Sequence, residues 1–169
     1  TSLLTINKLK KFNLLKNQSF IEFPKQGLEE LDLIVKTIKR LNGGLLLVDY
    51  GFLRQKSIDT LQSLKNHKKN MLFDNVGNAD ITSLVNFDLL KKYLKKKKLK
   101  VNNIVTQEFF LKRMGINERA EILSKKMNFK EKSDLYFRLQ RLINPEQMGK
   151  LFKAICAFKL KKNFSLGFV

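Results

Sequence analysis

One stretch decides the fold class of this chain, Gly43-Gly44-Leu45-Leu46-Leu47-Val48-Asp49-Tyr50-Gly51. Its apolar run at 45–48 lacks the alternation of apolar and polar residues that marks a strand with one solvated face. The run therefore predicts a central parallel strand of an α/β sheet, covered by helices on both faces. Ligands of such sheets bind beyond the carboxyl ends of the strands, so we expect chemistry near Asp49, Tyr50 and Gly51.

An amphipathic helix is predicted immediately before this strand, over residues 28–41. Its apolar residues recur at helical spacing, and its acidic first turn and basic last turn both suit the helix dipole. Asn42-Gly43 supplies the stop signal. Residues 1–24 indicate two short strands or irregular segments. Further along the chain we expect a short helix at 58–64, a helix around 89–94, a strand at 100–107, helices at about 108–115, 117–126 and 130–142, and a strand at 150–160.

The composition is typical of a single globular domain. The chain has 169 residues, of which 43% are apolar, and it contains only 2 Pro and 8 Gly. Cys156 is the only cysteine and His67 the only histidine, which excludes an internal disulfide framework and a metal site built from several cysteines or histidines. No apolar run approaches the roughly 18 residues of a membrane span. Because the chain starts at Thr1 rather than at a methionine, we expect residues to precede it.

The net charge of +19 allows two interpretations. A strongly basic chain can bind nucleic acid or an acidic membrane surface. The alternative is a compositional background that places lysines on every solvated face. Lysine far outnumbers arginine, although arginine is the residue that favours bidentate phosphate and base contacts. The densest lysine run, at 91–98, is typical of the C-terminal end of a helix. We therefore favour the background interpretation and do not expect nucleic acid to be the main partner.

Several catalytic signatures are absent from the sequence. There is no G-x-G-x-x-G or G-x-x-x-x-G-K-[ST] loop to cradle phosphates, and no G-x-S-x-G elbow to present a nucleophilic serine. The remaining polar residues cluster after the strand at 45–50. Each of them also suits an ordinary role as a helix cap, a turn residue or an exposed side chain. Their common position beside the ligand-facing end of a strand favours a site built from Asp49, Tyr50, Asp59-Thr60-Leu61-Gln62, His67, Asp80-Ile81-Thr82, Asn86-Phe87 and Thr106-Gln107.

A set of short motifs runs in a fixed order from about residue 28 to 158. They are Gly43-Gly44, Asp49-Tyr50-Gly51, Asp59-Thr60-Leu61-Gln62 with His67, Gly77 with Ala79-Asp80-Ile81-Thr82, Val85-Asn86-Phe87, Thr106-Gln107, Phe110-Leu111, Met114-Gly115-Ile116 with Arg119, Arg141-Leu142-Ile143-Asn144-Pro145 and Met148-Gly149-Lys150-Leu151-Phe152-Lys153. In these motifs the chain resembles the C-terminal half of the MidA-like family of S-adenosylmethionine-dependent methyltransferases. That family includes the mitochondrial methyltransferase that assists assembly of respiratory complex I.

The chain departs from the family pattern at two places. The family usually has His-Val-Asp-Phe where this chain has Leu84-Val85-Asn86-Phe87, so a histidine and an acid are replaced. A Pro-Gly turn of the family is Val76-Gly77 here. These differences leave catalytic roles at 84 and 86 open. The glycine-rich cofactor loop, the acidic ribose-binding residue and the Asn-Glu motif of the family are expected before Thr1.

The resemblance implies a fold and an activity. The fold class is α/β, the C-terminal half of a doubly wound, Rossmann-like methyltransferase sheet with additional helices. Residues 1–169 would form the C-terminal part of one domain whose N-terminal, cofactor-binding part is absent, and the strands at 100–107 and 150–160 would pair antiparallel. The implied activity is methyl transfer from S-adenosylmethionine to a protein arginine, with a complex I subunit as the partner. The implied location is the cytoplasm of a bacterium or the mitochondrion of a eukaryote.

Candidate roles follow from what arginine methylation requires. A guanidinium is always protonated and is a poor nucleophile, so a nearby carboxylate should orient it and take its proton. Asp49 and Asp80 are the acidic candidates, and Tyr50 and His67 are candidates for shaping or polarising the pocket. The candidates for substrate contacts are Gly51, Thr82 and Gln107. Two other classes stay open, a basic nucleic-acid-binding module and a non-catalytic scaffold that keeps the methyltransferase fold.

Overall fold

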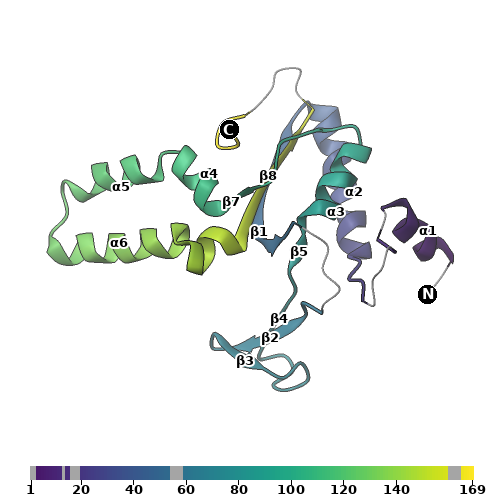
Figure 1. Cartoon of the computed structure of the whole chain (residues 1–169), viewed down its shortest axis with the longest axis horizontal. Coiled ribbons are helices and arrows are strands. Elements are labelled where there is room, and N and C mark those ends of the chain that lie inside the picture. Colours follow the sequence, from purple (N-terminus) through teal and green to yellow (C-terminus); the bar gives the residue numbers. More distant parts are fainter. Residues whose placement is uncertain (1–2, 13, 16–19, 54–58, 160–164) are drawn as a thin grey trace.

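The computed structural model of the chain describes residues 3–12, 14–15, 20–53, 59–159 and 165–169. A mixed five-stranded sheet forms the centre, and a small three-stranded sheet and a long helical arm project from it (Figure 1). The helices are α1 (Leu3–Lys11), α2 (Lys25–Leu41), α3 (Phe87–Lys96), α4 (Gln107–Arg113), α5 (Ile116–Ser124), α6 (Phe129–Ile143) and the single-turn η1 (Pro145–Gly149). The strands are β1 (Gly44–Phe52), β2 (Gln62–Lys65), β3 (Lys68–Asn70), β4 (Asp80–Thr82), β5 (Val85–Asn86), β6 (Lys100–Val101), β7 (Val105–Thr106) and β8 (Phe152–Phe158).

The predicted strand at 45–50 forms β1 of the main sheet, but the expected parallel pairing is wrong for these residues, because within the described part of the chain they pair only with the antiparallel strand β8. β8 runs antiparallel beside β1, from Gly44 opposite Phe158 to Tyr50 opposite Phe152. On its other side β1 pairs with β5 in parallel at Gly51 and Phe52. The strand expected at 100–107 is split into β6 and β7, which both pair antiparallel with β8. The α/β fold class and the antiparallel pairing of the last strands are thus confirmed.

The expectation that helices cover β1 on both faces was wrong for this chain. Leu45 and Leu47 pack into the main core, whereas the side chains of Leu46 and Val48, on the opposite face, are 49% and 40% exposed. The reason is that α2 and α3 both lie against the same face of the sheet, while α4 and the C-terminal Phe168 cover only the β8 region of the other face. An unbroken apolar run therefore does not by itself predict two covered faces.

Two further expectations were wrong. Residues 3–11 form the helix α1 instead of a strand or an irregular segment, because Leu9 packs from one helical face into the main core. Residues 14–15 and 20–24 are irregular, which was one of the two alternatives expected. A helix at 58–64 does not form, because residues 62–65 are the strand β2 between β3 and β4. Residues 1, 2, 13, 16–19, 58 and 160 of the predicted segments lie outside the described part of the chain. The other predicted helices are confirmed to within a few residues.

The main core lies between the sheet and the helices α2 and α3. The Tyr93 hydroxyl of α3 donates a 3.0 Å hydrogen bond to the Leu28 carbonyl of α2, and Lys97 Nζ lies 2.6 Å from Asp32 Oδ1. Burial raises the pKa of Asp32, but hydrogen bonds from Lys97 and Tyr93 outweigh it and hold that pKa below its usual value. Lys97 of the lysine run at 91–98 thus joins α3 to α2. The run also lies at the C-terminal end of α3, where cations suit the helix dipole.

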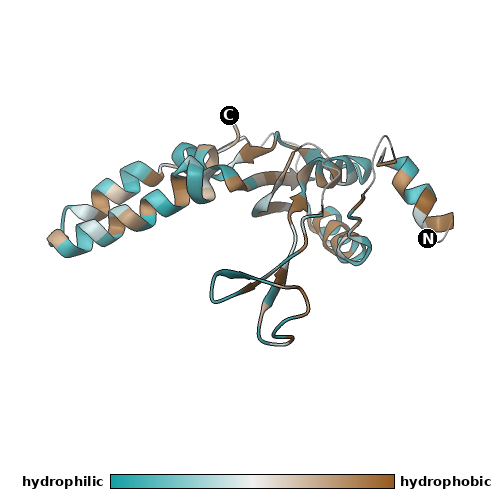
Figure 2. Cartoon of the chain, turned by 60° about the horizontal axis from the view of Figure 1, so that its bottom comes forward, coloured by the Kyte–Doolittle hydropathy of each residue, from teal (hydrophilic) through white to brown (hydrophobic). Residues whose placement is uncertain are grey.

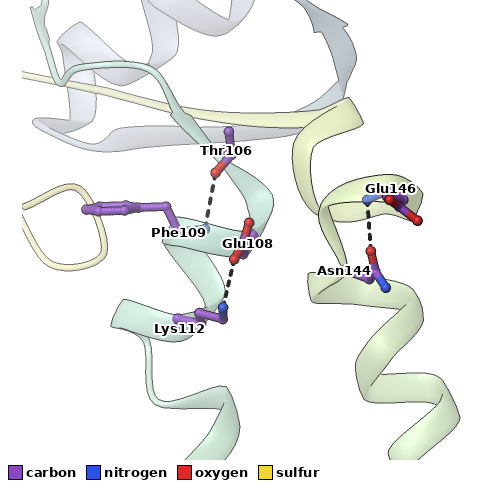
Figure 3. Close-up of polar contacts among 6 residues, drawn as sticks. All are labelled: Thr106, Glu108, Phe109, Lys112, Asn144 and Glu146. Atoms are coloured by element: carbon purple, nitrogen blue, oxygen red, sulfur yellow. Dashed lines mark hydrogen bonds and ion pairs between the residues drawn. The ribbon is translucent and has the colours of Figure 1, made fainter.

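The helical arm consists of α5 and α6, which lie side by side and extend away from the main sheet (Figure 1). Side chains at its base fix the chain locally (Figure 3). Thr106 Oγ1 accepts a hydrogen bond from the Phe109 N–H at the start of α4, and Asn144 Oδ1 accepts one from the Glu146 N–H after α6. Gln107 Nε2, at the start of α4, ties α4 to the end of α6 by donating to the Leu142 carbonyl over 2.8 Å.

The small sheet has the strand order β3-β2-β4 and projects below the main sheet (Figure 2). The turn between β2 and β3 places Asn66 and His67 at φ values of 51° and 62°. Two consecutive residues with positive φ form the tight turn that suits a hairpin.

Among the described residues, no helix is long and apolar enough to cross a membrane.

Candidate functional site

A cavity of about 680 Å³ lies beside β1, between α2, α3 and the start of β5. Its walls are largely apolar and come from segments far apart in the sequence. They include Phe20, Phe23, Leu28, Leu31, Ile34, Leu47, Val48, Leu61, Leu84, Val85, Phe87, Leu89 and Leu90. We call this cavity the acidic pocket, because all of its charged lining residues in the described part of the chain are acidic.

Four carboxylates line the acidic pocket, those of Glu22, Glu30, Asp49 and Asp59. The whole chain has 15 acidic residues against 34 lysines and arginines. None of the lining residues within the described part of the chain is Lys or Arg. Carboxylates grouped on low-dielectric walls create a local negative potential even in a basic protein. The pocket is therefore suited to a positively charged group.

The two aspartates among these carboxylates each accept a hydrogen bond from a nearby backbone N–H. Asp49 Oδ1 accepts the N–H of Tyr50 over 2.8 Å, at the carboxyl end of β1. Asp59 Oδ1 accepts the N–H of Leu61 over 2.9 Å, in the turn that leads into β2. Each bond occupies one oxygen and fixes the orientation of the carboxylate. A second oxygen of each side chain can then meet a cation.

Glu22 binds Thr60 through three hydrogen bonds. The Thr60 N–H donates to Glu22 Oε1 over 3.0 Å, and the Thr60 hydroxyl lies 2.9 and 2.8 Å from Oε1 and Oε2. Thr60 Oγ1 in turn accepts the N–H of Leu84 over 2.9 Å. Glu22 thereby connects three walls of the acidic pocket and fixes the backbone next to Asp59. This role could not be predicted from the sequence, because a lone acid between Ile21 and Phe23 resembles an interruption of an apolar cluster.

Replacing Glu22 with glutamine should lower the free energy of unfolding by roughly 1–3 kcal/mol. The charged Glu22 carboxylate now accepts both the Thr60 N–H and the Thr60 hydroxyl, and a neutral glutamine would be a weaker acceptor whose amide nitrogen cannot accept the hydroxyl proton. Urea titration of the protein measures the change. Glu30→Gln, on the same pocket wall, is the control and should change stability by less than about 0.5 kcal/mol. Equal effects of the two substitutions would contradict the connecting role of Glu22.

A second cleft, of about 1050 Å³, opens between the end of β1 and the small sheet. Tyr50 lines it, whereas the preceding residue, Asp49, lines the acidic pocket. The two spaces meet, since Asp59, Leu61 and Leu84 line both. Thr82 of β4 also lines this cleft, where its hydroxyl accepts a hydrogen bond from Gln62. We call this space the small-sheet cleft.

The structure brings only some of the predicted site residues together. Asp49 lines the acidic pocket, and Tyr50 and Thr82 line the small-sheet cleft. His67 lies exposed at the turn of the small sheet and Asp80 lies exposed at the start of β4, and neither lines these two spaces. Gln107 is buried at the base of the arm, where it binds Leu142.

Gly51 has a packing function that the sequence did not reveal. A Cβ atom at this position would lie 2.2 Å from the Val85 carbonyl oxygen and 2.8 Å from the Phe87 ring. Glycine is therefore what allows β5 to approach β1. Asn86, one of the departures from the family pattern, caps α3 by accepting the Leu89 N–H over 3.0 Å. Leu84, another of these departures, contributes an apolar wall to both spaces.

The remaining reactive groups lie elsewhere. Among the residues that the structure describes, no three His, Cys, Asp or Glu side chains are placed to hold a metal ion. Cys156 is buried in β8, and its burial raises the pKa of the thiol, which disfavours the reactive thiolate. The acidic pocket and the small-sheet cleft are therefore the candidate site.

Comparison with known proteins relates this site to a family. Residues 4–105 match the family model described as "Putative S-adenosyl-L-methionine-dependent methyltransferase". The mitochondrial protein arginine methyltransferase NDUFAF7 of Xenopus laevis is 31% identical over 121 residues, which are 71% of this chain and 27% of the relative. The chain thus spans about a quarter of the length of the curated relatives it matches.

Two solved structures from Burkholderia thailandensis share the fold. An uncharacterized protein has a TM-score of 0.69 at 23% identity, and the match covers 82% of this chain and 40% of the other. A second protein, bound to S-adenosyl-homocysteine, has a TM-score of 0.60 at 22% identity, with 82% and 37% covered. With the family model matching more than half of its residues, this chain belongs to the family of S-adenosylmethionine-dependent methyltransferases that this model describes.

Proposed function

We propose that this chain is the C-terminal part of a methyltransferase domain that transfers a methyl group from S-adenosylmethionine to an arginine of a protein. The observation that carries the proposal is the acidic pocket. Four carboxylates and no described Lys or Arg line a pocket at the end of the central strand of a chain with a net charge of +19. A guanidinium is a permanent cation with an apolar stem, so it matches both the charge and the apolar walls.

The residues of this chain fit the acceptor side of the reaction. S-adenosylmethionine supplies a methyl group that its sulfonium already activates. The chain has no glycine-rich loop after a strand that could hold the cofactor. We therefore assign the cofactor-binding residues to the part of the relatives that this chain does not cover. The acidic pocket would hold the arginine that faces the cofactor.

The carboxylates have distinct roles in this proposal. Asp59, oriented by the Leu61 N–H, binds the guanidinium as an ion pair and fixes its approach to the methyl group. Asp49, oriented by the Tyr50 N–H, accepts the proton that the attacking nitrogen loses. Glu22 is a positioning residue, because it acts on Asp59 through Thr60. The apolar walls exclude water and strengthen these interactions.

We also propose how the rest of the domain joins this chain. Within the described residues, β1 has a partner on its β5 side only at Gly51 and Phe52. The earlier part of that edge borders the acidic pocket, through Leu47, Val48 and Asp49. Unpaired backbone groups of an edge strand readily accept another strand. A strand of the N-terminal part of the domain would pair with this edge and fill the apolar end of the pocket.

The biological setting is inferred from the relatives. The curated relatives cited above are named as mitochondrial protein arginine methyltransferases. We propose a protein substrate accordingly, with a subunit of respiratory complex I as the first candidate. The location would be the mitochondrion in a eukaryote and the cytoplasm in a bacterium.

The full-length enzyme should bind an arginine peptide at least about tenfold more tightly than the same peptide with citrulline in place of arginine. Citrulline has nearly the same shape but no charge, so about 1.4 kcal/mol or more of ion-pair energy would be lost. Isothermal titration calorimetry with both peptides measures the difference. Asp59→Asn should remove most of it, whereas Asp134→Asn, on the arm, should leave it unchanged. Equal affinities of the wild-type enzyme for both peptides would overturn the assignment of the pocket to a cation.

A further inference from the structure

We propose that the small-sheet cleft is the docking groove for the polypeptide that carries the methylated arginine, and that it selects apolar residues next to that arginine. The inference rests on the proposed function of the acidic pocket and adds the location and chemistry of the flanking segment. The occupant is one extended stretch of a protein substrate. It would place its arginine in the acidic pocket and continue over the small sheet.

Continuity between the two spaces is the first argument. Asp59, Leu61 and Leu84 line both the acidic pocket and the small-sheet cleft. A chain whose side chain enters the acidic pocket can therefore continue past these residues into the small-sheet cleft. From there it would meet Tyr50 and Leu151 on one wall and the small sheet on the other.

The size of the cleft is the second argument. Its volume of about 1050 Å³ comes in addition to the acidic pocket of about 680 Å³. Pockets for small molecules usually measure about 300–1,000 Å³. The acidic pocket alone is thus large enough for an arginine side chain. The additional cleft fits a substrate that extends well beyond the modified residue, such as a polypeptide.

The lining of the cleft is the third argument. Its apolar residues are Tyr50, Leu61, Leu64, Met71, Leu72, Phe73, Leu84 and Leu151. Hydrogen-bonding side chains lie between them, namely Thr60, Gln62, Ser63, Asn70 and Thr82. Of these, the partly exposed Gln62 and Thr82 can meet the backbone of an extended peptide. The charged lining residues within the described part of the chain are Asp59, Asp74 and Lys69, so their charges nearly cancel. This composition favours an uncharged, apolar segment beside the arginine.

The loop after β3 is the fourth argument, because it presents apolar side chains from a fixed backbone. Phe73 is 89% exposed, and Met71 and Val76 are also exposed. Asn70 Nδ2 donates to the carbonyls of Met71 and Asp74 over 3.0 and 2.7 Å. Asn75 bridges Asn70 and Lys65 by two further hydrogen bonds. These hydrogen bonds fix the loop backbone while its apolar side chains remain exposed to water. Such a loop is preorganised to bind an apolar partner.

The test compares two equally exposed phenylalanines in the full-length enzyme. Phe73 lies at the small-sheet cleft, and Phe129 lies at the start of α6 on the arm, and both side chains are 89% exposed. Phe73→Ala and Phe129→Ala therefore remove the same side chain at the same exposure. The probes are acetylated peptides of about nine residues, which span roughly 30 Å when extended. One has leucine on both sides of a central arginine, a second has serine there, and a third has citrulline between the two leucines.

We expect Phe73→Ala to weaken binding of the leucine-flanked arginine peptide by roughly fivefold or more, which is about 1 kcal/mol. The same substitution should weaken binding of the citrulline peptide by a similar factor, because the contact of Phe73 with the flanking leucines does not depend on the charge of the central residue. The serine-flanked peptide should bind the wild-type enzyme more weakly than the leucine-flanked one and should respond less to the substitution. Phe129→Ala should leave all three affinities unchanged.

The result that overturns the docking groove is an unchanged affinity of Phe73→Ala for the leucine-flanked peptide, or an equal loss in Phe129→Ala. A preference for serine over leucine would overturn the apolar selectivity. Failure of the acidic pocket is a separate outcome, because it appears as equal binding of arginine and citrulline peptides by the wild-type enzyme. Fluorescence anisotropy with labelled peptides measures all of these affinities, and it does not require turnover.

Discussion

Replacing Asp49 with asparagine in the full-length enzyme should lower methyl transfer by roughly a hundredfold or more, while the melting temperature changes little. The asparagine carbonyl can still accept the Tyr50 N–H that Asp49 Oδ1 accepts now, so the end of β1 should keep its shape. What the substitution removes is the negative charge and the basic oxygen that take the proton from the guanidinium. Turnover with labelled S-adenosylmethionine and thermal melting, on the same preparation, measure both quantities.

Asp134→Asn is the matched control, because Asp134 is an exposed carboxylate on α6 and lines neither the acidic pocket nor the small-sheet cleft. Its turnover should equal that of the wild-type enzyme. If Asp49→Asn instead melted much earlier and kept normal turnover per folded molecule, Asp49 would be a structural residue and the proposed proton acceptor would have to be another carboxylate.

Replacing Gly51 with alanine should lower the free energy of unfolding by about 3 kcal/mol or more. The new Cβ would lie 2.2 Å from the Val85 carbonyl oxygen, and a backbone atom cannot turn aside as a flexible side chain can. Relief requires β5 to move away from β1, which breaks their pairing at Gly51 and Phe52. Since β5 leads into α3 and its residues line the acidic pocket, substrate binding should fall as well.

Gly43→Ala tests the same change where space is available. A Cβ at Gly43 meets no atom within 4 Å, so this variant should differ from the wild type by less than about 0.5 kcal/mol. Urea titrations of both variants give the comparison. Similar stabilities of the two variants would mean that the close approach of β5 to β1 does not hold in solution.

The elements that could be predicted from the sequence are those whose local signals agree. Helix α2 combines a helical apolar stripe, a cationic last turn and Asn42, which takes the left-handed conformation that ends the helix. Strand β1 follows at once and contains four consecutive apolar residues. In α2 periodicity, capping and length indicate the same element, and in β1 the apolar run and the glycines on either side of it do.

The elements that could not be predicted depend on contacts between distant segments. Helix α1 exposes Leu3 and Leu4 and buries Leu9, so its apolar face is narrow. This face can be recognised only once the core against which it packs is known. Strand β2 is short, and its hairpin turn uses Asn66 and His67 instead of a residue pair with glycine. Short strands joined by such a turn have a weak local signal.

The candidate site could be predicted only in part. Asp49 stands at the end of a strong strand signal, and the rule that ligands bind at carboxyl ends of strands locates it. Glu22 and Glu30 come from the segment before α2 and from α2 itself, and only tertiary packing brings them to the same pocket. Gln107 and Gly51 were expected to contact substrate, but the structure gives them packing and hydrogen-bonding roles inside the fold.

Localising the transferred methyl group tests the central claim most directly. The full-length enzyme would be incubated with S-adenosylmethionine that carries an isotope-labelled methyl group and with a library of arginine-containing peptides, and tandem mass spectrometry would locate the label. We expect the label on arginine side chains, and we expect it to be lost in Asp49→Asn but not in Asp134→Asn. A label on lysine or glutamine, or no transfer by an enzyme that binds S-adenosylmethionine, would contradict the assignment of the acidic pocket to a methyl-accepting arginine.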